Sequence, residues 1–193
     1  MTLNKRQLQK EQTKNQIIKA AYNVYAEKGF SATTSDIAKA SKVSHGTVFV
    51  HFPTRDDLLI CLLEDFDSEI TTRMHELTEK SQHFSDILEA HLSALEEHEA
   101  FYTRLINENR LLPPDVRNTF IAIQSTIAFH MNKVMEKECE VMKHDIPNHF
   151  IFNTWVGLIH YYLQNNDLFA PDSSVIKRYR NELINNFLKL IKQ

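Results

Sequence analysis

One stretch of twenty residues, TTSDIAKASKVSHGTVFVHF at positions 33–52, constrains the fold of this chain more than any other. Thr33 and Asp36 form a capping box that predicts the start of one short helix. Ser44 is placed to cap a second short helix that ends near His51. The inward apolar positions are Ile37, Ala38, Val43, Val48 and Phe52. Two short helices on a tight turn form a helix-turn-helix, whose second helix fits the major groove of DNA.

The second of these helices carries hydrogen-bonding and aromatic side chains on its outward side. Those residues are Ser44, His45, Thr47, Phe49 and His51. They are of types that contact phosphates and base edges. Gly46 has no side chain, so the backbone can approach DNA closely there. Simpler interpretations of these residues stay open. Thr34 and Ser44 could serve only as helix caps, His45 could be an ordinary surface histidine, and the Phe49 ring could fill the small core.

Arg55 lies in the first turn of the helix that is expected after Pro53. A cation is disfavoured at that end of a helix by the helix dipole. An external anion such as a DNA phosphate would explain its placement, and we therefore interpret Arg55 as a phosphate contact.

This region, over about residues 10–70, resembles the DNA-binding segment of the TetR family of bacterial transcriptional regulators. The resemblance rests on Thr34-x-Asp36-Ile37-Ala38, then Val43-Ser44-x-Gly46-Thr47-x-Phe49-x-His51-Phe52, then Arg55-x-x-Leu58. It implies DNA contacts from Thr34, Ser35, Ser44, His45, Gly46, Thr47, Phe49, His51 and Arg55, with His45 at a base edge. Two positions differ, because Lys42 stands where the family often has Gly and Phe49 where it often has Tyr.

Charge is divided unevenly along the chain. Residues 1–57 hold nine Lys/Arg and five Asp/Glu, whereas residues 58–193 hold thirteen Lys/Arg and twenty Asp/Glu. A basic first part on an acidic body fits one segment that meets phosphate and another that does not, although chance clustering of solvated charges gives the same balance.

Apolar spacing predicts helices throughout the chain, about nine in all, with no strand. The first is expected to begin within residues 8–12 and to stop at Gly29. Before it, Lys5, Arg6, Lys10 and Lys14 are interpreted as a basic arm on DNA or as a solvated tail. A long helix over residues 55–80 would join a DNA-binding domain at 1–54 to a regulatory and dimerisation domain at 55–193.

Later boundaries follow from capping and proline signals. Ser85 is expected to cap one helix. Pro113 and Pro114 would open another helix that runs to about His144, and Pro147 suits the first position of the next.

The last two expected helices predict a homodimer. Residues 150–163, FIFNTWVGLIHYYL, are apolar nearly all round, and the final helix carries a second apolar stripe. A helix that is apolar on more than one side must be covered on more than one side. A twofold four-helix interface would cover both helices, as the resemblance also implies. The interface residues are predicted to be Trp155, Gly157, Leu158, Tyr161, Tyr162, Ile176, Tyr179, Leu183, Phe187 and Leu190.

Inward residues of the middle helices are candidates for a ligand pocket. They are Phe66, His91, Tyr102, Phe120, Gln124, Ile127, Trp155 and Ile159. The mix favours an apolar or aromatic small molecule that releases a repressor from a palindromic operator. The alternatives are that these residues are ordinary core, and that the same DNA-binding dimer answers to a protein partner or acts as an activator.

No enzyme, metal or cofactor is expected. The ten histidines form no HExxH motif, and the chain has no nucleophile elbow and no glycine-rich phosphate loop. Cys61 and Cys139 lack the spacing of a metal site. The longest apolar run, residues 58–63, is too short to cross a membrane. We therefore expect a cytoplasmic protein whose partners are double-stranded operator DNA, a second copy of itself and an unidentified small-molecule effector.

Overall fold

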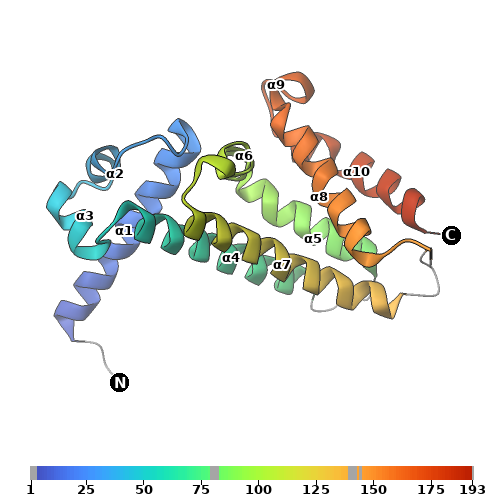
Figure 1. The fold of residues 1–193 in the computed structure, drawn as a ribbon, viewed down its shortest axis with the longest axis horizontal. Helices are drawn as coiled ribbons and strands as arrows, with labels where there is room; N and C mark the ends of the chain where they lie inside the picture. The colour runs from blue at the N-terminus through green and yellow to red at the C-terminus, as the bar shows by residue number, and fades with distance from the viewer. Residues whose placement is uncertain (1–3, 79–82, 139–142, 144, 193) are drawn as a thin grey trace.

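The computed structural model describes residues 4–78, 83–138, 143 and 145–192. Over these ranges the chain forms α-helices and one 3₁₀ helix, without a β-strand (Figure 1). The elements are α1 (Lys5–Lys28), α2 (Thr34–Ala40), α3 (His45–His51), α4 (Arg55–Thr78), α5 (Phe84–Glu97), α6 (Glu99–Glu108), η1 (Asn109–Leu111), α7 (Pro114–Lys137), α8 (Asn148–Gln164), α9 (Asn166–Phe169) and α10 (Val175–Ile191). The all-α prediction is confirmed, and the four-residue helix α9 is an addition to it.

Helices α1, α2 and α3 form a head at one end of the molecule (Figure 1). The capping box of α2 is present as expected: the Asp36 N–H donates to Thr33 Oγ1 at 3.2 Å, and the Thr33 N–H donates to Asp36 Oδ2 at 3.0 Å. Ser44 Oγ caps α3 by accepting from the Thr47 N–H at 3.0 Å. The inward apolar side chains Ile37, Ala38, Val48 and Phe52 are buried. Local capping and apolar spacing therefore produce the predicted helix-turn-helix.

Helix α1 begins earlier than the sequence predicted. Asn4 caps it: its Oδ1 accepts from the Arg6 N–H at 3.4 Å, and its own N–H donates to Gln7 Oε1 at 3.0 Å. The basic residues Lys5, Arg6, Lys10 and Lys14 consequently lie on the first turns of α1 and not on an arm that precedes it. The expected end of α1 is confirmed at Gly29, whose φ of +76° is the left-handed conformation that suits glycine.

The remaining helices form a longer body. Helix α4 packs against α5 and α7, α10 packs against α5, and α8 packs against α6, α7 and α10 (Figure 1). The start of α4 is fixed as expected, because the Thr54 N–H donates to Asp57 Oδ2 at 2.9 Å and the Asp57 N–H donates to Thr54 Oγ1 at 3.0 Å. One continuous apolar core runs from α1 to α10.

Several predicted boundaries of the body were wrong. Ser85 does not cap α5, which begins at Phe84. The residue that follows α7 takes that role, since Glu138 Oε2 accepts from the Phe84 N–H at 2.9 Å. Helix α7 ends at Lys137, before the predicted end at His144, which lies outside the described residues together with Cys139. Pro147 is the residue before α8 and not its first position.

Aromatic side chains join the head to the body. Tyr22 of α1 stacks on Phe101 of α6 with ring centroids 4.6 Å apart, and Phe66 of α4 lies 5.4 Å from the same ring. Glu108 at the end of α6 adds a polar contact, because its Oε2 accepts from the Phe30 N–H at 2.7 Å. The orientation of the head is therefore set by contacts with both α4 and α6.

Candidate functional site

The outward face of α3 carries His45, Gly46, Phe49 and Val50, all of which are exposed. Phe49 exposes 41% and Val50 73% of its surface. Val50 was missed by sequence reasoning, because an apolar residue in a short helix fits an inward position equally well. Its spacing of four residues from Gly46 is the signal that could have placed it outside.

Hydrogen bonds orient the polar groups on this face. His45 Nε2 lies 2.9 Å from Thr34 Oγ1, which links α3 to α2, and the His45 ring meets the Phe49 ring edge to face at 4.9 Å. Ser44 Oγ and Thr47 Oγ1 are 2.7 Å apart. The predicted DNA-contact residues Thr34, Ser35, Ser44, His45, Gly46, Thr47 and Phe49 thus come together on adjacent parts of α2 and α3, with Thr34 and Thr47 half-buried.

Arg55 has a structural role that the sequence did not reveal. Its guanidinium donates a hydrogen bond to the Phe30 carbonyl and lies over the Tyr25 ring, 5.9 Å from the centroid. The protein itself therefore supplies the partner that we had assigned to an external anion. The position of Arg55 can be explained without a DNA phosphate. Contact between Arg55 and a phosphate therefore stays a prediction.

Basic side chains of α1 lie near the end of α3. Burial, together with the positive charges of Lys10 and Lys14, lowers the pKa of His51 from its usual value. His51 is half-buried, so less of its ring is available to DNA than the sequence suggested. The proximity of Lys10 and Lys14 was missed because both had been placed on a separate arm.

Lys42 lies in the turn between α2 and α3, at the position where the resembled family often has Gly. Lys42 adopts a positive φ of 54°, the conformation that the resemblance assigns to Gly at this place. A non-glycine residue in this region costs about 1 kcal/mol. The side chain of Lys42 is exposed, which allows it to take this conformation without a clash in the core.

The predicted ligand residues are mostly packed into the core of the body. Phe66, His91, Tyr102, Phe120, Ile127, Trp155 and Ile159 are all buried, and Gln124 is half-buried. Several of their polar atoms bond within the protein: Trp155 Nε1 donates to His91 Nδ1 at 3.0 Å, and Tyr102 Oη lies 2.8 Å from His160 Nε2. Three of the predicted residues, His91, Tyr102 and Trp155, thus take part in polar contacts across α5, α6 and α8.

Burial shifts the titration of this cluster. Desolvation lowers the pKa of His91 to about 3, with a smaller contribution from His160. Desolvation also lowers the pKa of His160 to about 4. Both imidazoles are therefore neutral at pH 7. In the neutral His91 ring, Nδ1 accepts from Trp155 and Nε2 carries the proton, and Nε2 has no hydrogen-bond partner among the described residues.

The predicted dimer residues divide into two groups. Trp155, Ile176, Leu183 and Phe187 are buried within the single chain, which leaves them little surface to offer to a second copy. In the second stripe of α10, Ile184 and Ile191 are buried and Leu188 is half-buried. The remaining predicted residues lie at the surface: Gly157, Tyr161 and Leu190 are exposed, and Leu158, Tyr162 and Tyr179 are half-buried.

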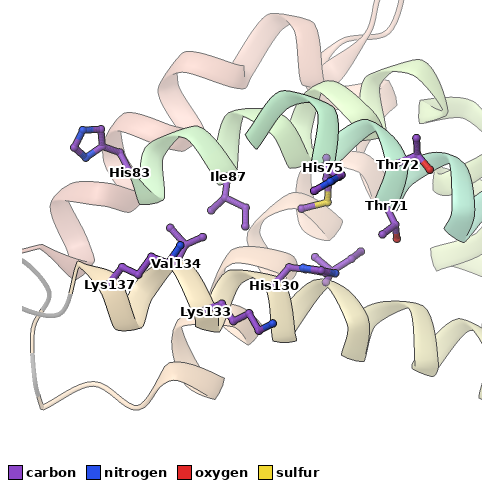
Figure 2. Close-up of a pocket in the computed structure, with 11 residues that line it drawn as sticks. Thr71, Thr72, His75, His83, Ile87, His130, Lys133, Val134 and Lys137 are labelled. Carbon is purple, nitrogen blue, oxygen red and sulfur yellow. The ribbon is translucent and has the colours of Figure 1, made fainter. Parts of the chain in front are cut away.

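A cleft of about 680 Å³ lies between α4, the start of α5 and α7 (Figure 2). It is lined by Thr71, Thr72, Met74, His75, His83, Ile87, Ile127, His130, Lys133, Val134 and Lys137. Its volume is in the usual range of small-molecule sites. Of the predicted ligand residues, Ile127 lines this cleft. The sequence could not reveal it, because its walls come from three helices whose packing is decided only by the fold.

The parts of the chain that the structure describes contain no group of three or more His, Cys, Asp or Glu side chains placed to hold a metal ion. Within the same parts, no helix combines the length and hydropathy that crossing a membrane requires. Cys61 is a half-buried free cysteine.

The model of a family described as "Bacterial regulatory proteins, tetR family" matches residues 17–61, which include α2 and α3. An HTH-type transcriptional repressor of Mycobacterium tuberculosis is 40% identical over 67 residues, which are 34% of this chain and 36% of that protein. An uncharacterised HTH-type regulator of Bacillus subtilis, YuxN, is 28% identical over 126 residues, 62% of this chain and 43% of that protein. The match spans about a third of the length of the first of these relatives.

Solved structures match over nearly the whole length. A TetR family regulator from Agrobacterium tumefaciens superposes with a TM-score of 0.78 and 15% identity, over 95% of this chain and all of that chain. The regulator FadR from Bacillus subtilis, solved in complex with stearoyl-CoA, superposes with a TM-score of 0.75 and 21% identity, over 90% of this chain and 96% of that chain. At these identities the likeness establishes the fold.

Proposed function

Since this chain belongs to the TetR family of bacterial regulatory proteins, we propose that it is a DNA-binding transcriptional regulator, and specifically a homodimeric repressor of a palindromic operator. Residues 1–54 form its DNA-binding domain, and residues 55–193 form its regulatory and dimerisation domain. It acts without catalysis, beside the chromosome in the bacterial cytoplasm. A small-molecule effector in the body releases it from the operator.

The observation that carries the DNA-binding proposal is the surface of α3. His45, Gly46 and Phe49 are exposed on one face of a helix that follows a tight turn, with Lys10 and Lys14 of α1 close to its end. Such a helix can place hydrogen-bonding and apolar groups at base edges while lysines meet phosphates. In a twofold dimer, two copies would read half-sites about 34–36 Å apart.

Selection of bound duplexes from a random-sequence pool tests this proposal. The natural chain is expected to select a palindrome. His45→Ala is expected to lose discrimination at the contacted base pair, by about 1–3 kcal/mol, and to bind nonspecific duplex nearly unchanged. His149→Ala, an exposed histidine on α8, is the matched control and keeps the consensus. An unchanged consensus in His45→Ala, with weaker binding everywhere, would remove His45 as a base reader; no enriched sequence at all would remove the proposed function.

The exposed surface of α8 supports the dimer. Phe150 and Tyr161 expose 58% and 57% of their surface, and a Cβ on Gly157 would meet no atom within 4 Å. Leu190 adds a 60% exposed side chain from α10. We place the twofold interface on this surface in preference to the buried residues that the sequence suggested.

Tyr161→Glu is therefore expected to weaken dimerisation by about tenfold or more, because a charge replaces an aromatic ring at the centre of the interface. Sedimentation over a range of concentrations measures the change. Leu111→Glu is the matched control, since Leu111 is 85% exposed on η1. Equal dissociation of both variants, or of neither, would place the interface elsewhere. A charge at the buried Leu183 is expected to unfold the chain instead.

An effector with an apolar body is supported by the walls of the cleft between α4, α5 and α7. One similar protein was solved with stearoyl-CoA, a ligand with a long acyl chain. The alternative is a DNA-binding dimer of the same fold that is controlled by a protein partner or acts as an activator. It is favoured if no small molecule alters operator binding.

A further inference from the structure

Positively ionisable side chains gather around the cleft between α4, α5 and α7. His75 comes from α4, His83 from the start of α5, and His130, Lys133 and Lys137 from α7 (Figure 2). Among the described residues that line it there is no carboxylate. Residues 58–193 carry twenty Asp/Glu against thirteen Lys/Arg. The charge at the cleft is therefore opposite to that of the part of the chain that contains it.

Four apolar side chains line part of the cleft. Met74 of α4, Ile87 of α5 and Ile127 of α7 are buried, and Val134 of α7 is half-buried beside them. A molecule that enters would bury its own apolar surface against these four side chains, which is favourable because apolar surface is removed from water. Apolar walls with a few charged groups at the rim are typical of small-molecule sites.

Two carboxylates that contact residues lining the cleft already have partners. Glu138 accepts from His83 Nδ1 at 2.7 Å and from the Phe84 N–H, and its carboxylate lies 3.7 Å from Lys192 Nζ. Asp67 accepts from the Thr71 hydroxyl at 3.3 Å. The partners of these two carboxylates are therefore groups other than Lys133 and Lys137.

The two lysines of α7 are not matched by an acid within the described ranges. Lys133 Nζ lies over the Phe129 ring, 4.4 Å from its centroid, and Lys137 forms no ion pair with a described residue. Two adjacent turns of one helix thus present ammonium groups at the edge of an apolar cleft.

We propose that this cleft binds a small amphipathic anion, a carboxylate or phosphate ester on an apolar body, with the anionic group at Lys133 and Lys137 and the apolar body against Met74, Ile87 and Val134. This assignment rests on the proposed function, since it names the chemical class of the effector. The cleft lies along the second half of α4, whose first residue, Arg55, bonds to the Phe30 carbonyl in the head. A ligand that displaces α4 therefore acts on a helix that is attached directly to the DNA-binding part.

Calorimetric titration with decanoate, decyl phosphate and decan-1-ol, each below its aggregation concentration, tests the assignment. Both anions are expected to bind, and the alcohol is expected to bind at least about tenfold more weakly, because it lacks the charge-assisted hydrogen bonds. Preference for the carboxylate or for the phosphate identifies which anionic group the effector carries. Equal binding of the alcohol and both anions would overturn the assignment of charge.

Substitutions locate the site. Lys137→Met is expected to weaken binding of decanoate by about tenfold and to leave decan-1-ol unchanged, whereas Lys189→Met, an exposed lysine on α10, changes neither. Val134→Trp fills the cleft and is expected to abolish binding of all three probes. Equal effects of the two lysine variants, or full binding by Val134→Trp, would overturn the proposal.

Duplex binding by the same preparations separates this inference from the proposed function. Val134→Trp serves as a folded variant if it keeps the helical circular dichroism of the natural chain and still binds the selected duplex. If the natural chain binds duplex DNA but none of the three probes, the proposed class of effector is wrong, and the proposed function as a DNA-binding regulator is retained. If it binds no duplex at all, the proposed function fails, whatever the probes do.

Discussion

The free energy of unfolding is expected to fall as the pH is lowered from about 6.5 towards 4, and the buried histidines His91 and His160 are expected to be the main cause. Burial lowers the pKa of His91 to about 3 and that of His160 to about 4, whereas both titrate near 6.5 in the unfolded chain. Between these values the unfolded state binds more protons than the folded state, so protons favour unfolding. The stabilisation is complete above pH 6.5 and is lost as the pH approaches the folded pKa values.

The expected loss between pH 7 and pH 5 is on the order of 2–4 kcal/mol, since one pKa unit corresponds to about 1.4 kcal/mol and both groups contribute. This is a large part of the stability of an ordinary domain. Urea unfolding at a series of pH values measures it.

His91→Asn tests the assignment. The Asn amide oxygen can still accept from Trp155 Nε1, so the variant removes the titrating ring and keeps an acceptor near the indole. It is expected to be less stable than the natural chain at pH 7 and to lose stability less steeply below pH 6.5. His149→Asn, at an exposed position, retains the full pH dependence. The same steep dependence in His91→Asn and in His160→Gln would mean that other groups are responsible.

Glu99→Ala is expected to destabilise the chain by about 2–4 kcal/mol, because one carboxylate of α6 holds the start of α10. Glu99 Oε1 accepts from the Val175 N–H at 2.8 Å, and Oε2 accepts from the Ser174 hydroxyl at 2.6 Å and from the Ile176 N–H at 3.1 Å. The negative charge also lies at the positive end of the helix dipole. Without it, backbone donors at a half-buried helix end lose their partner.

Urea unfolding at pH 7 compares Glu99→Ala with two variants. Glu99→Gln keeps one acceptor oxygen without the charge and is expected to lose roughly half as much stability. Glu97→Ala removes only the exposed ion pair with Arg73, whose Nε lies 3.0 Å from Glu97 Oε1, and is expected to cost less than about 1 kcal/mol. Equal losses for Glu99→Ala and Glu97→Ala would show that the contact with α10 contributes little.

The sequence was informative where structure depends on neighbours a few residues apart. The capping pairs Thr33–Asp36 and Thr54–Asp57, the stop at Gly29 and the apolar spacing of α2 and α3 act within one or two helical turns. Such signals can be recognised without knowing what packs where. The capping box formed by Asn4 and Gln7 is a local signal of the same kind. It was overlooked, and the start of α1 was therefore predicted too late in the sequence.

Only the tertiary structure decided which helix faces are covered. Side chains from both apolar stripes of α10 are buried within one chain, Arg55 bonds to a carbonyl of the head, and Glu138 caps α5 from across the body. The same holds for the isolation of His91 from water and for the cleft between α4, α5 and α7. A residue's spacing fixes the face of the helix on which it lies, whereas burial, hydrogen-bond partners and cavities depend on helices that are distant in the chain and meet only after folding.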